Sequence, residues 1–295
     1  MEQANAIELK NITKRFGEVV ANDSVDLSVK HGEILSVLGE NGSGKTTLMN
    51  MISGIYFPDE GQIFVDGEEV SICSPKDSFA LGIGMIHQHF KLVDVLTAAE
   101  NIILGLEGKS VLDMKKVVQD IQEVTERYGF ELDPNQKIYD MSVSQKQTVE
   151  IVKMLYRGAN ILILDEPTAV LTPQETEKLF TVLRNMRDQG KSIIIITHKL
   201  NEVLALSDRV SVLRKGKYIG TVETKNATAE SLTEMMVGEK IDLNIERPDP
   251  VNPVKRLVIE NLSCVNKEGV KTLKNASMEA YGGEILGIAG IAGSG

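Results

Sequence analysis

Short hydrophobic segments separated by amphipathic ones run through most of the chain and predict an α/β fold. Residues 7–12 and 24–29 alternate apolar and polar side chains, as half-buried strands do. Mainly aliphatic runs at 33–38, 161–164, 192–197 and 210–213 are typical of strands buried on both faces. Helices are expected at 45–53, 174–188, 200–205 and 228–237. The alternation predicts a mainly parallel sheet covered by helices, with a β-rich subdomain at the N-terminus.

The periodicity changes between residues 91 and 157. Val117, Val118, Ile121 and Val124 recur at the spacing of one helix face, which predicts a helical subdomain inserted into the α/β core. The segment 238–253 is polar and contains three prolines. We interpret it as a linker that follows a first domain of residues 1–237.

The chain begins to repeat itself after this linker. Residues 283–295 read GEILGIAGIAGSG and align with GEILSVLGENGSG at 32–44, with eight of the thirteen positions identical. Residues 257–262 likewise resemble residues 7–12. The pattern predicts that residues 254–295 begin a second copy of the first domain, truncated inside its glycine loop. We therefore expect a fragment of a tandem protein, whose last ~40 residues are too few to build a core.

Composition and charge narrow the class of partner. The chain has 295 residues, 42% hydrophobic and 25% charged, as in a globular protein of about two domains. A net charge of −10 argues against nucleic acid, because binding to it draws heavily on basic side chains. No aliphatic run approaches the ~20 residues of a membrane span, and the N-terminus lacks a signal-peptide pattern. We expect a cytoplasmic chain in which Cys73 and Cys264 are reduced and buried.

A glycine-rich loop is the strongest chemical signal. Between a predicted strand and a predicted helix, the sequence fits G-x-x-x-x-G-K-[ST] with Gly39, Glu40, Asn41, Gly42, Ser43, Gly44, Lys45 and Thr46, and Thr47 follows. Glycines in such a loop let backbone N–H groups converge on phosphate oxygens, and the helix N-terminus adds positive potential. We expect Lys45 to reach the β- and γ-phosphates and the Thr46 hydroxyl to help hold Mg²⁺.

Two acidic residues end the next strong strand signal. Asp165 and Glu166 follow the aliphatic run 161–164, which places them at the carboxyl end of a buried strand, where ligands bind in open α/β sheets. Asp165 is expected to complete the Mg²⁺ shell, and Glu166 to orient or deprotonate an attacking water. Taken alone, the pair also fits an acidic cap of the next helix.

Histidines add weaker signals. His198 follows the run 192–197, whose end should lie beside that of 161–164, and could hydrogen-bond a γ-phosphate oxygen. A structural histidine is the alternative. His87 and His89 flank Gln88, but two histidines without nearby carboxylates or cysteines are weak support for a metal site.

These motifs occur in the order and spacing of the nucleotide-binding subunits of ABC transporters, which the chain resembles over residues 1–238 and again from about 254. The resemblance implies an ABC-type P-loop NTPase fold that takes ATP and Mg²⁺. It implies that residues 39–46 are the Walker A loop and that Asp165 and Glu166 are the Walker B pair. It further implies that Gln88 belongs to the Q-loop beside Mg²⁺, that His198 is the switch histidine and that Phe16 stacks on adenine. A core aromatic is the alternative for Phe16.

Two segments depart from the family pattern. The signature that usually reads L-S-G-G-Q is Met141-Ser142-Val143-Ser144-Gln145 here, and Thr148 replaces the usual arginine. In the family this segment caps the ATP of the opposite domain, so the resemblance assigns that role to Ser142, Val143, Ser144 and Gln145. Side chains at both glycine positions should hinder close approach to phosphate, which argues against a fast hydrolytic site. Thr172 stands where the family tends to have aspartate.

The tandem arrangement without membrane spans looks like the importer ATPases for nucleosides and for ribose-type sugars. The stretches 85–90, 92–102 and 168–175 look more like the nucleoside branch. The resemblance implies an ATPase at the cytoplasmic face of the membrane that energises solute import. Its implied partners are integral-membrane permease subunits, the second ABC domain of the full-length chain and, indirectly, an extracytoplasmic substrate-binding lipoprotein. Import of ribose-type sugars is the alternative.

Two further classes stay open. A soluble tandem ABC protein that acts on ribosomes or DNA is disfavoured by the short, proline-containing linker and by the net negative charge. An ATP sensor without turnover is supported by the altered signature. Because the expected partner signature lies outside this chain, we expect the chain itself to bind MgATP but to hydrolyse it weakly.

Overall fold

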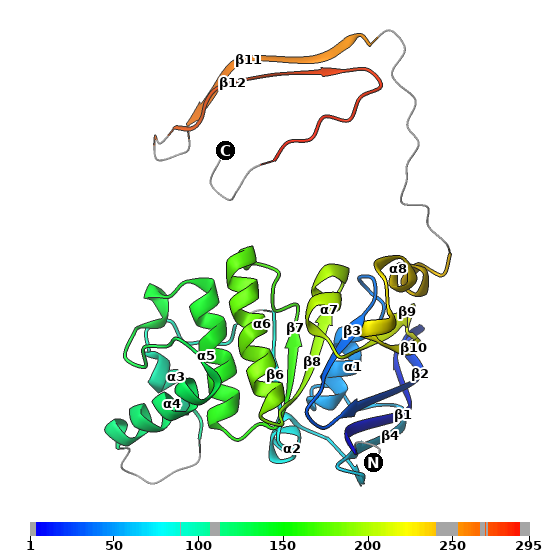
Figure 1. Cartoon of the computed structure of the whole chain (residues 1–295), viewed down its shortest axis with the longest axis vertical. Coiled ribbons are helices and arrows are strands. Elements are labelled where there is room, and N and C mark those ends of the chain that lie inside the picture. Colours follow the sequence, from blue (N-terminus) through cyan, green and yellow to red (C-terminus); the bar gives the residue numbers. More distant parts are fainter. Residues whose placement is uncertain are drawn as a thin grey trace. The chain divides into compact units, whose positions relative to one another are not determined.

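The computed structural model describes residues 4–88, 90–106, 113–239, 253–265, 269 and 271–289. The chain divides into two units, residues 1–241 and 242–295 (Figure 1). Most of the linker predicted at 238–253 lies outside the described residues, as do His89 and residues 290–295.

The aliphatic runs of the first unit assemble into a six-stranded sheet in the order β10-β9-β3-β8-β7-β6. The strands are β3 (Ile34–Leu38), β6 (Ile83–Ile86), β7 (Ile161–Asp165), β8 (Ser192–Thr197), β9 (Arg209–Arg214) and β10 (Lys217–Glu223). Neighbours from β9 to β6 run parallel, and β10 is antiparallel to β9. The predicted mainly parallel sheet is confirmed.

Both faces of the parallel strands are buried, which explains why their sequences are mainly aliphatic. Successive side chains point to opposite faces. One set packs with α1 (Lys45–Ile52) and includes Leu35, Val37, Ile163 and Ile194. The other packs with α5 (Val143–Tyr156) and α6 (Pro173–Asp188) and includes Ile34, Leu162, Leu164 and Ile195. In this register Leu38 pairs with Thr197 and Asp165 with Ile196, so three strands end at one edge of the sheet.

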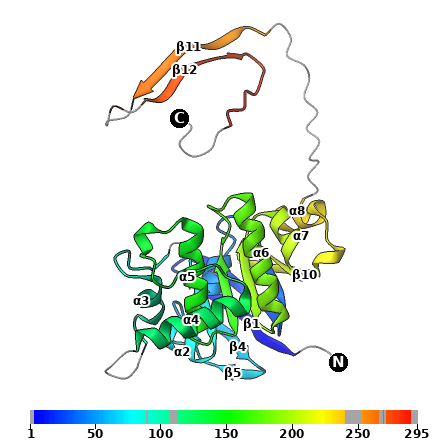
Figure 2. The same cartoon turned by 60° about the vertical axis from the view of Figure 1, so that its left-hand side comes forward.

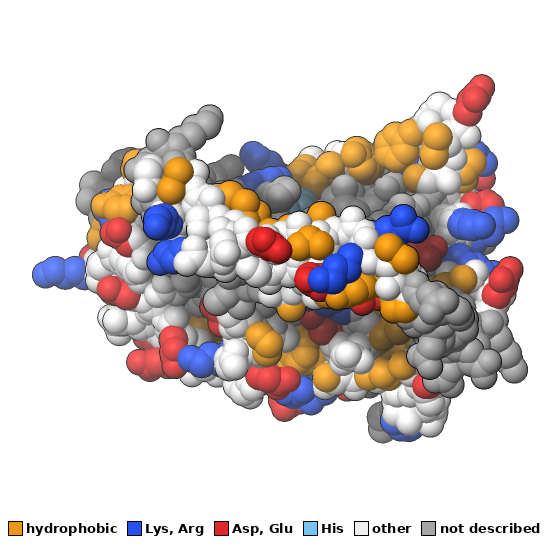
Figure 3. Space-filling model, turned by 90° about the horizontal axis from the view of Figure 1, so that it is seen from above, with side chains coloured by type: hydrophobic (Ala, Val, Ile, Leu, Met, Phe, Trp, Pro, Cys, Tyr) orange, Lys and Arg blue, Asp and Glu red, His pale blue; other side chains and the backbone are white. Residues whose placement is uncertain are grey.

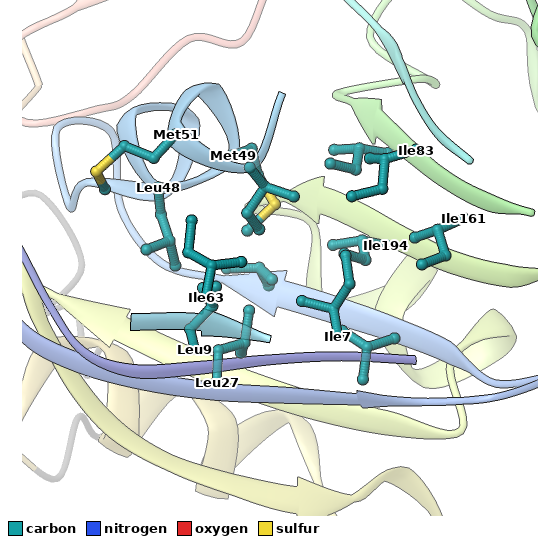
Figure 4. Packing of buried hydrophobic residues seen from close by; sticks show 14 of the residues in the cluster. Ile7, Leu9, Leu27, Leu48, Met49, Met51, Ile63, Ile83, Ile161 and Ile194 are labelled. Atoms are coloured by element: carbon teal, nitrogen blue, oxygen red, sulfur yellow. The ribbon is translucent and has the colours of Figure 1, made fainter. Parts of the chain in front are cut away.

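A four-stranded sheet covers the other side of α1. Its order is β2-β1-β4-β5, and its strands are β1 (Asn5–Phe16), β2 (Val19–Lys30), β4 (Glu60–Val65) and β5 (Glu68–Val70). Leu48 and Met49 point from α1 into the cluster that holds Ile63 of β4 and Ile194 of β8 (Figure 4). Because both sheets share this cluster, α1 is fixed from two sides.

Three helices pack on one another beside the sheet (Figure 2). They are α3 (Ala98–Ile103), α4 (Met114–Tyr128) and α5, with the short η1 (Ile138–Asp140) between α4 and α5. The predicted helix face is confirmed, because Val117 and Ile121 are buried and Val118 and Val124 are partly buried in one cluster. The other helices of the first unit are α2 (Pro75–Ala80), α7 (Leu200–Leu206), η2 (Thr224–Asn226) and α8 (Ala229–Val237).

The second unit is a two-stranded hairpin of β11 (Lys255–Val265) and β12 (Lys271–Tyr281). Its pairs Leu257–Ala280, Ile259–Met278 and Leu262–Ala276 repeat the β1–β2 pairs Ile7–Val29, Leu9–Leu27 and Ile12–Val25. Asn11 and Asn261 even share a φ of 52° at equivalent bulges. The hydrophobic residues that β1 and β2 bury are largely exposed here, because none of the other described residues of this unit covers the hairpin. The internal repeat therefore extends from sequence to backbone.

The cysteine prediction is wrong in one respect. Cys73 and Cys264 are both exposed, and neither forms a disulfide. Cys73 lies just before α2, where its N–H donates to Asp77 Oδ2 at 3.1 Å. Cys264 lies on the uncovered hairpin.

Candidate functional site

The glycine-rich loop joins the carboxyl end of β3 to the N-terminus of α1. Gly44 precedes the helix in the left-handed region, with a φ of 96°. A Cβ at Gly44 would lie 2.4 Å from the Ala21 carbonyl oxygen, so only glycine fits between the loop and β2. The first N–H groups of α1 have no partners within the helix and therefore face the loop, as anion binding requires.

The Lys45 side chain is folded back onto this loop. Its ammonium donates to the Gly39 carbonyl at 2.7 Å and the Glu40 carbonyl at 2.8 Å, and lies 3.4 Å from Ser43 Oγ. Burial lowers the pKa of Lys45, and the Glu166 and Asp165 carboxylates oppose that shift. A phosphate oxygen could replace the loop carbonyls as the acceptor, because it offers the buried ammonium a full negative charge.

The acidic pair meets this loop from β7. Thr46 Oγ1 donates to Asp165 Oδ2 at 3.4 Å, although the two residues are 119 positions apart. Burial raises the pKa of Asp165, and the nearby Glu166 carboxylate adds to the shift. Gln88 follows β6 and lines a small cavity of about 30 Å³ together with Asp165 and Glu166. The structure thus brings Thr46, Gln88 and Asp165 to one edge of the sheet.

Glu166 and His198 form a pair at the ends of β7 and β8. His198 Nδ1 lies 2.8 Å from Glu166 Oε1. Glu166 has a φ of 46°, and its N–H donates to the Ile196 carbonyl at 2.9 Å. A non-glycine residue in this left-handed conformation is strained, and such strain gathers at functional sites. The neighbouring strand ends were predicted, but nothing in the sequence predicted the direct contact of Glu166 with His198.

A pocket of about 470 Å³ opens over the loop. Its lining includes Asn41, Gly42, Ser43, Gly44, Lys45, Thr46, Thr47 and Glu166. Sequence reasoning missed its other walls, which are Val19, Val20 and Ala21 at the start of β2 and Lys215 and Gly216 in the β9–β10 turn. Phe16 does not line this pocket. Its ring is 43% exposed and packs edge-on against Tyr56 with centroids 5.2 Å apart, so it is not a core aromatic.

The signature residues lie elsewhere in the first unit. Ser142 caps α5 and accepts a hydrogen bond from the Gln145 N–H, while Gln145 Oε1 accepts one from the Ser142 N–H at 2.9 Å. Ser142, Ser144 and Gln145 line a cavity of about 550 Å³ beside α6, which is separate from the loop pocket. Val143 is 44% exposed at the first turn of α5. The exposed Val143 side chain and the N-terminus of α5 therefore lie apart from the glycine-rich loop of the same unit.

Thr172 and His87, two residues that the sequence pattern indicated, have surroundings that belong to the packing of the fold. Thr172 caps α6, where it accepts from the Glu175 N–H and donates to Glu175 Oε2 at 2.9 Å. Threonine and aspartate both cap helices well, so threonine in place of aspartate preserves the N-cap of α6. His87 is partly buried, which lowers its pKa. Among the described residues no group of three or more histidine, cysteine or acidic side chains could hold a metal ion.

Comparison with known proteins gives a consistent result. Residues 22–169 match the ABC transporter family. The nucleoside import ATP-binding protein NupA of Lactococcus lactis subsp. cremoris is 48% identical over 100% of this chain and 59% of its own length. The guanosine import ATP-binding protein NupO of Bacillus subtilis is 47% identical over 98% of this chain and 57% of its own length. The ribose import ATP-binding protein RbsA of Clostridium tetani is 41% identical over 100% of this chain and 58% of its own length. The chain thus spans less than two thirds of these relatives.

A solved structure has the same architecture. The ADP conformation of MJ1267, described as an ATP-binding cassette of an ABC transporter, superposes with a TM-score of 0.71 at 26% identity. That match covers 80% of this chain and 99% of the other.

The loop geometry predicts different effects for two glycine substitutions. In Gly42→Ala the added Cβ would have no other atom within 4 Å. The substitution should therefore lower the free energy of unfolding by only about 1 kcal/mol, because of the positive φ at this position. Gly44→Ala adds a clash with the backbone of Ala21 and should cost about 3 kcal/mol or more, since β2 must shift. Urea unfolding of both variants without nucleotide measures the difference. Equal losses of unfolding free energy would contradict the assigned close approach at Gly44.

Proposed function

The chain belongs to the ABC transporter family, and on that premise we propose that its first unit binds MgATP and takes part in ATP hydrolysis that drives solute import. Membership confirms the predicted ABC-type P-loop fold. The observation that carries the proposal is the convergence of three chain segments at one sheet edge. Lys45 and Thr46 come from the loop after β3, Asp165 and Glu166 from the end of β7, and His198 from the end of β8.

The residues at this edge fit a nucleotide with its magnesium ion. The Thr46 hydroxyl and Asp165 carboxylate are adjacent, and Gln88 lines the same small cavity as Asp165. Such oxygen donors suit Mg²⁺, which keeps several waters and is shared with phosphates. When bound, the ion neutralises charge on the β- and γ-phosphates. Lys45 and the N–H groups of the loop hold the phosphate chain, and Phe16 is proposed to stack on adenine.

Glu166 is the proposed base. Its carboxylate accepts a proton from a water positioned for attack on the γ-phosphate. His198 holds that carboxylate through Nδ1, which limits the rotation of Glu166 and fixes the direction of its second oxygen. His198 is also proposed to hydrogen-bond the γ-phosphate. The contact with Glu166 uses Nδ1, which leaves Nε2 for the phosphate.

A complete site needs a second domain. The residues Ser142, Val143, Ser144 and Gln145 line no part of the loop pocket, so we propose that they face an ATP held by another copy of the fold. The repeated hairpin supports the proposal that residues 254–295 belong to that second copy, after a linker at 238–253. The exposed Val143 would hinder phosphate approach, so the composite site formed by this signature should turn over slowly.

The permease is the proposed membrane partner, with an extracytoplasmic substrate-binding lipoprotein acting indirectly. Within the described residues no helix has the length and apolar character needed to cross a membrane. We propose that the protein lies at the cytoplasmic face of the membrane and docks on permease subunits. In Figure 3, acidic, basic and hydrophobic side chains are interspersed among the described residues that face the viewer. Nucleic acid is not a proposed partner.

Nucleosides are the proposed solutes. The relatives named for nucleoside and guanosine import are 48% and 47% identical to the chain, and the ribose import relative is 41% identical. Ribose-type sugars are the second candidate, supported by that same relative. The loop pocket says nothing about the solute, because in this proposal it holds only ATP.

Two substitutions should separate binding from turnover. Lys45→Ala removes the buried cation of the loop and should weaken ATP binding at least tenfold, about 1.4 kcal/mol. Glu166→Gln keeps the shape of the pocket and should bind ATP normally, with hydrolysis by the assembled transporter reduced at least a hundredfold. Glu177→Gln, an exposed site on α6, is the matched control. Isothermal titration and phosphate release measure the two effects, and undiminished turnover in Glu166→Gln would exclude it as the base.

Uptake by cells tests the solute. Cells without this gene should lose uptake of labelled guanosine and keep uptake of labelled ribose. A gene that carries Glu177→Gln should restore guanosine uptake, whereas one that carries Glu166→Gln should not. Loss of ribose uptake alone would favour the sugar branch with the same ATP chemistry. If neither uptake changes, the importer proposal for these solutes is wrong.

A further inference from the structure

The turn between β9 and β10 carries a cation that the sequence motifs did not indicate. Lys215 and Gly216 line the loop pocket, although they lie about 170 residues after the glycine-rich loop. The Gly216 N–H donates to the Ser43 carbonyl at 3.1 Å, and its own carbonyl accepts from the Asp23 N–H at 2.8 Å. The turn is therefore bonded both to the phosphate-binding loop and to β2.

The basic residues of this hairpin differ in their partners. Lys217 forms an ion pair with Asp23 at 3.2 Å, and Arg214 lies 3.4 Å from the Met235 carbonyl. Lys215 is exposed, and across the part of the chain that the structure describes its side chain has no hydrogen bond or ion pair. An unpaired ammonium at the wall of a pocket is available to an anionic ligand.

The turn holds Lys215 in an unfavourable conformation. Lys215 has a φ of 49° and Gly216 a φ of 78°, so both central residues of this two-residue turn are left-handed. Asparagine followed by glycine is the preferred pair for such a turn, and lysine at the first position is strained. A Cβ at Gly216 would lie 2.9 Å from the Ala21 oxygen. This close approach explains why residue 216 is glycine, but it does not explain why residue 215 is lysine. A charge requirement would explain why lysine stands there.

The position in the pocket indicates which part of a nucleotide it meets. Residues Asn41 to Thr47 form the phosphate wall, and Val19 and Val20 form an apolar wall on the side of β2. Lys215 lines the same pocket from a turn bonded to both walls. Lys45 belongs to the far end of the phosphate chain, near Glu166.

We infer that Lys215 is a second nucleotide-binding cation that contacts the phosphates nearest the nucleoside. The inference rests on the proposed function, because it takes the pocket ligand to be a nucleotide. ATP and ADP share these phosphates, so Lys215 contributes equally to the affinity for both. An exposed ammonium is screened by salt, and its contribution is therefore larger at low ionic strength.

The test compares Lys215→Asn with Lys217→Asn, a matched change two residues away. Isothermal titration of MgATP and MgADP is run at about 50 mM and about 300 mM salt, where screening differs strongly. Lys215→Asn should lower the affinity for both nucleotides about fivefold at low salt, and by a smaller factor at high salt. Asparagine relieves the turn, so the Tm of this variant without nucleotide should rise by about 2 °C. Lys217→Asn should bind both nucleotides as the unsubstituted chain does.

The opposite movements of affinity and Tm distinguish a binding role from a structural one. Affinity that falls together with a lower Tm would overturn the inference, since a damaged turn would explain both. Unchanged affinity of Lys215→Asn at both salt concentrations would overturn it while leaving the proposed function intact. If the unsubstituted chain bound neither nucleotide, the proposed function and this inference would both fail.

Discussion

Burial of both faces of the parallel sheet is the constraint on which the rest of the structure depends. The aliphatic side chains of β3, β7 and β8 alternate between the α1 side and the α5–α6 side, and this fixes the register of the strands. Because parallel strands share a direction, their carboxyl ends meet at one edge. The loop after β3, Asp165 at the end of β7 and His198 after β8 are consequently brought together from three distant parts of the chain. A slip of one residue in any of these strands would turn its hydrophobic side chains to the wrong face and separate the polar groups.

The polar groups at this edge are hydrogen-bonded to one another or to the backbone of the loop. Lys45 is bonded to carbonyls of its own loop, Thr46 to Asp165, and Glu166 to His198. These contacts satisfy buried or strained groups that would otherwise be costly to hold in place. Under the proposed function, a nucleotide exchanges partners with this preformed arrangement rather than assembling it. A site built on strand ends and a helix N-terminus gains precision from the rigidity of those elements.

The parts that the sequence predicted correctly are those dictated by local pattern. Long aliphatic runs identified the central strands, and Asp165 and His198 could be placed at strand ends because they directly follow such runs. Lys45 could be placed because the glycine-rich loop joins residues 33–38 to the next helix. β6 was missed because it has only four residues and contains Gly84, which packs against Met154. Lys215 could not be found because its place at the loop pocket depends on the tertiary path of the β9–β10 hairpin, whose Gly216 N–H donates to the Ser43 carbonyl. Burial of Cys73 and Cys264 was predicted from residue type alone. Both are exposed, because Cys73 lies just before α2 and Cys264 lies on an uncovered hairpin.

The central claim is that one sheet edge of the first unit is the nucleotide site. Hydrogen exchange of the chain, with and without a non-hydrolysable ATP analogue and Mg²⁺, tests it most directly because it reports where the backbone becomes protected. The account predicts slower exchange at the amides of residues 42–47, 165–166 and 197–198, and little change on the β11–β12 hairpin. Protection that is absent, or that is confined to the cavity between Ser142 and α6, would contradict it.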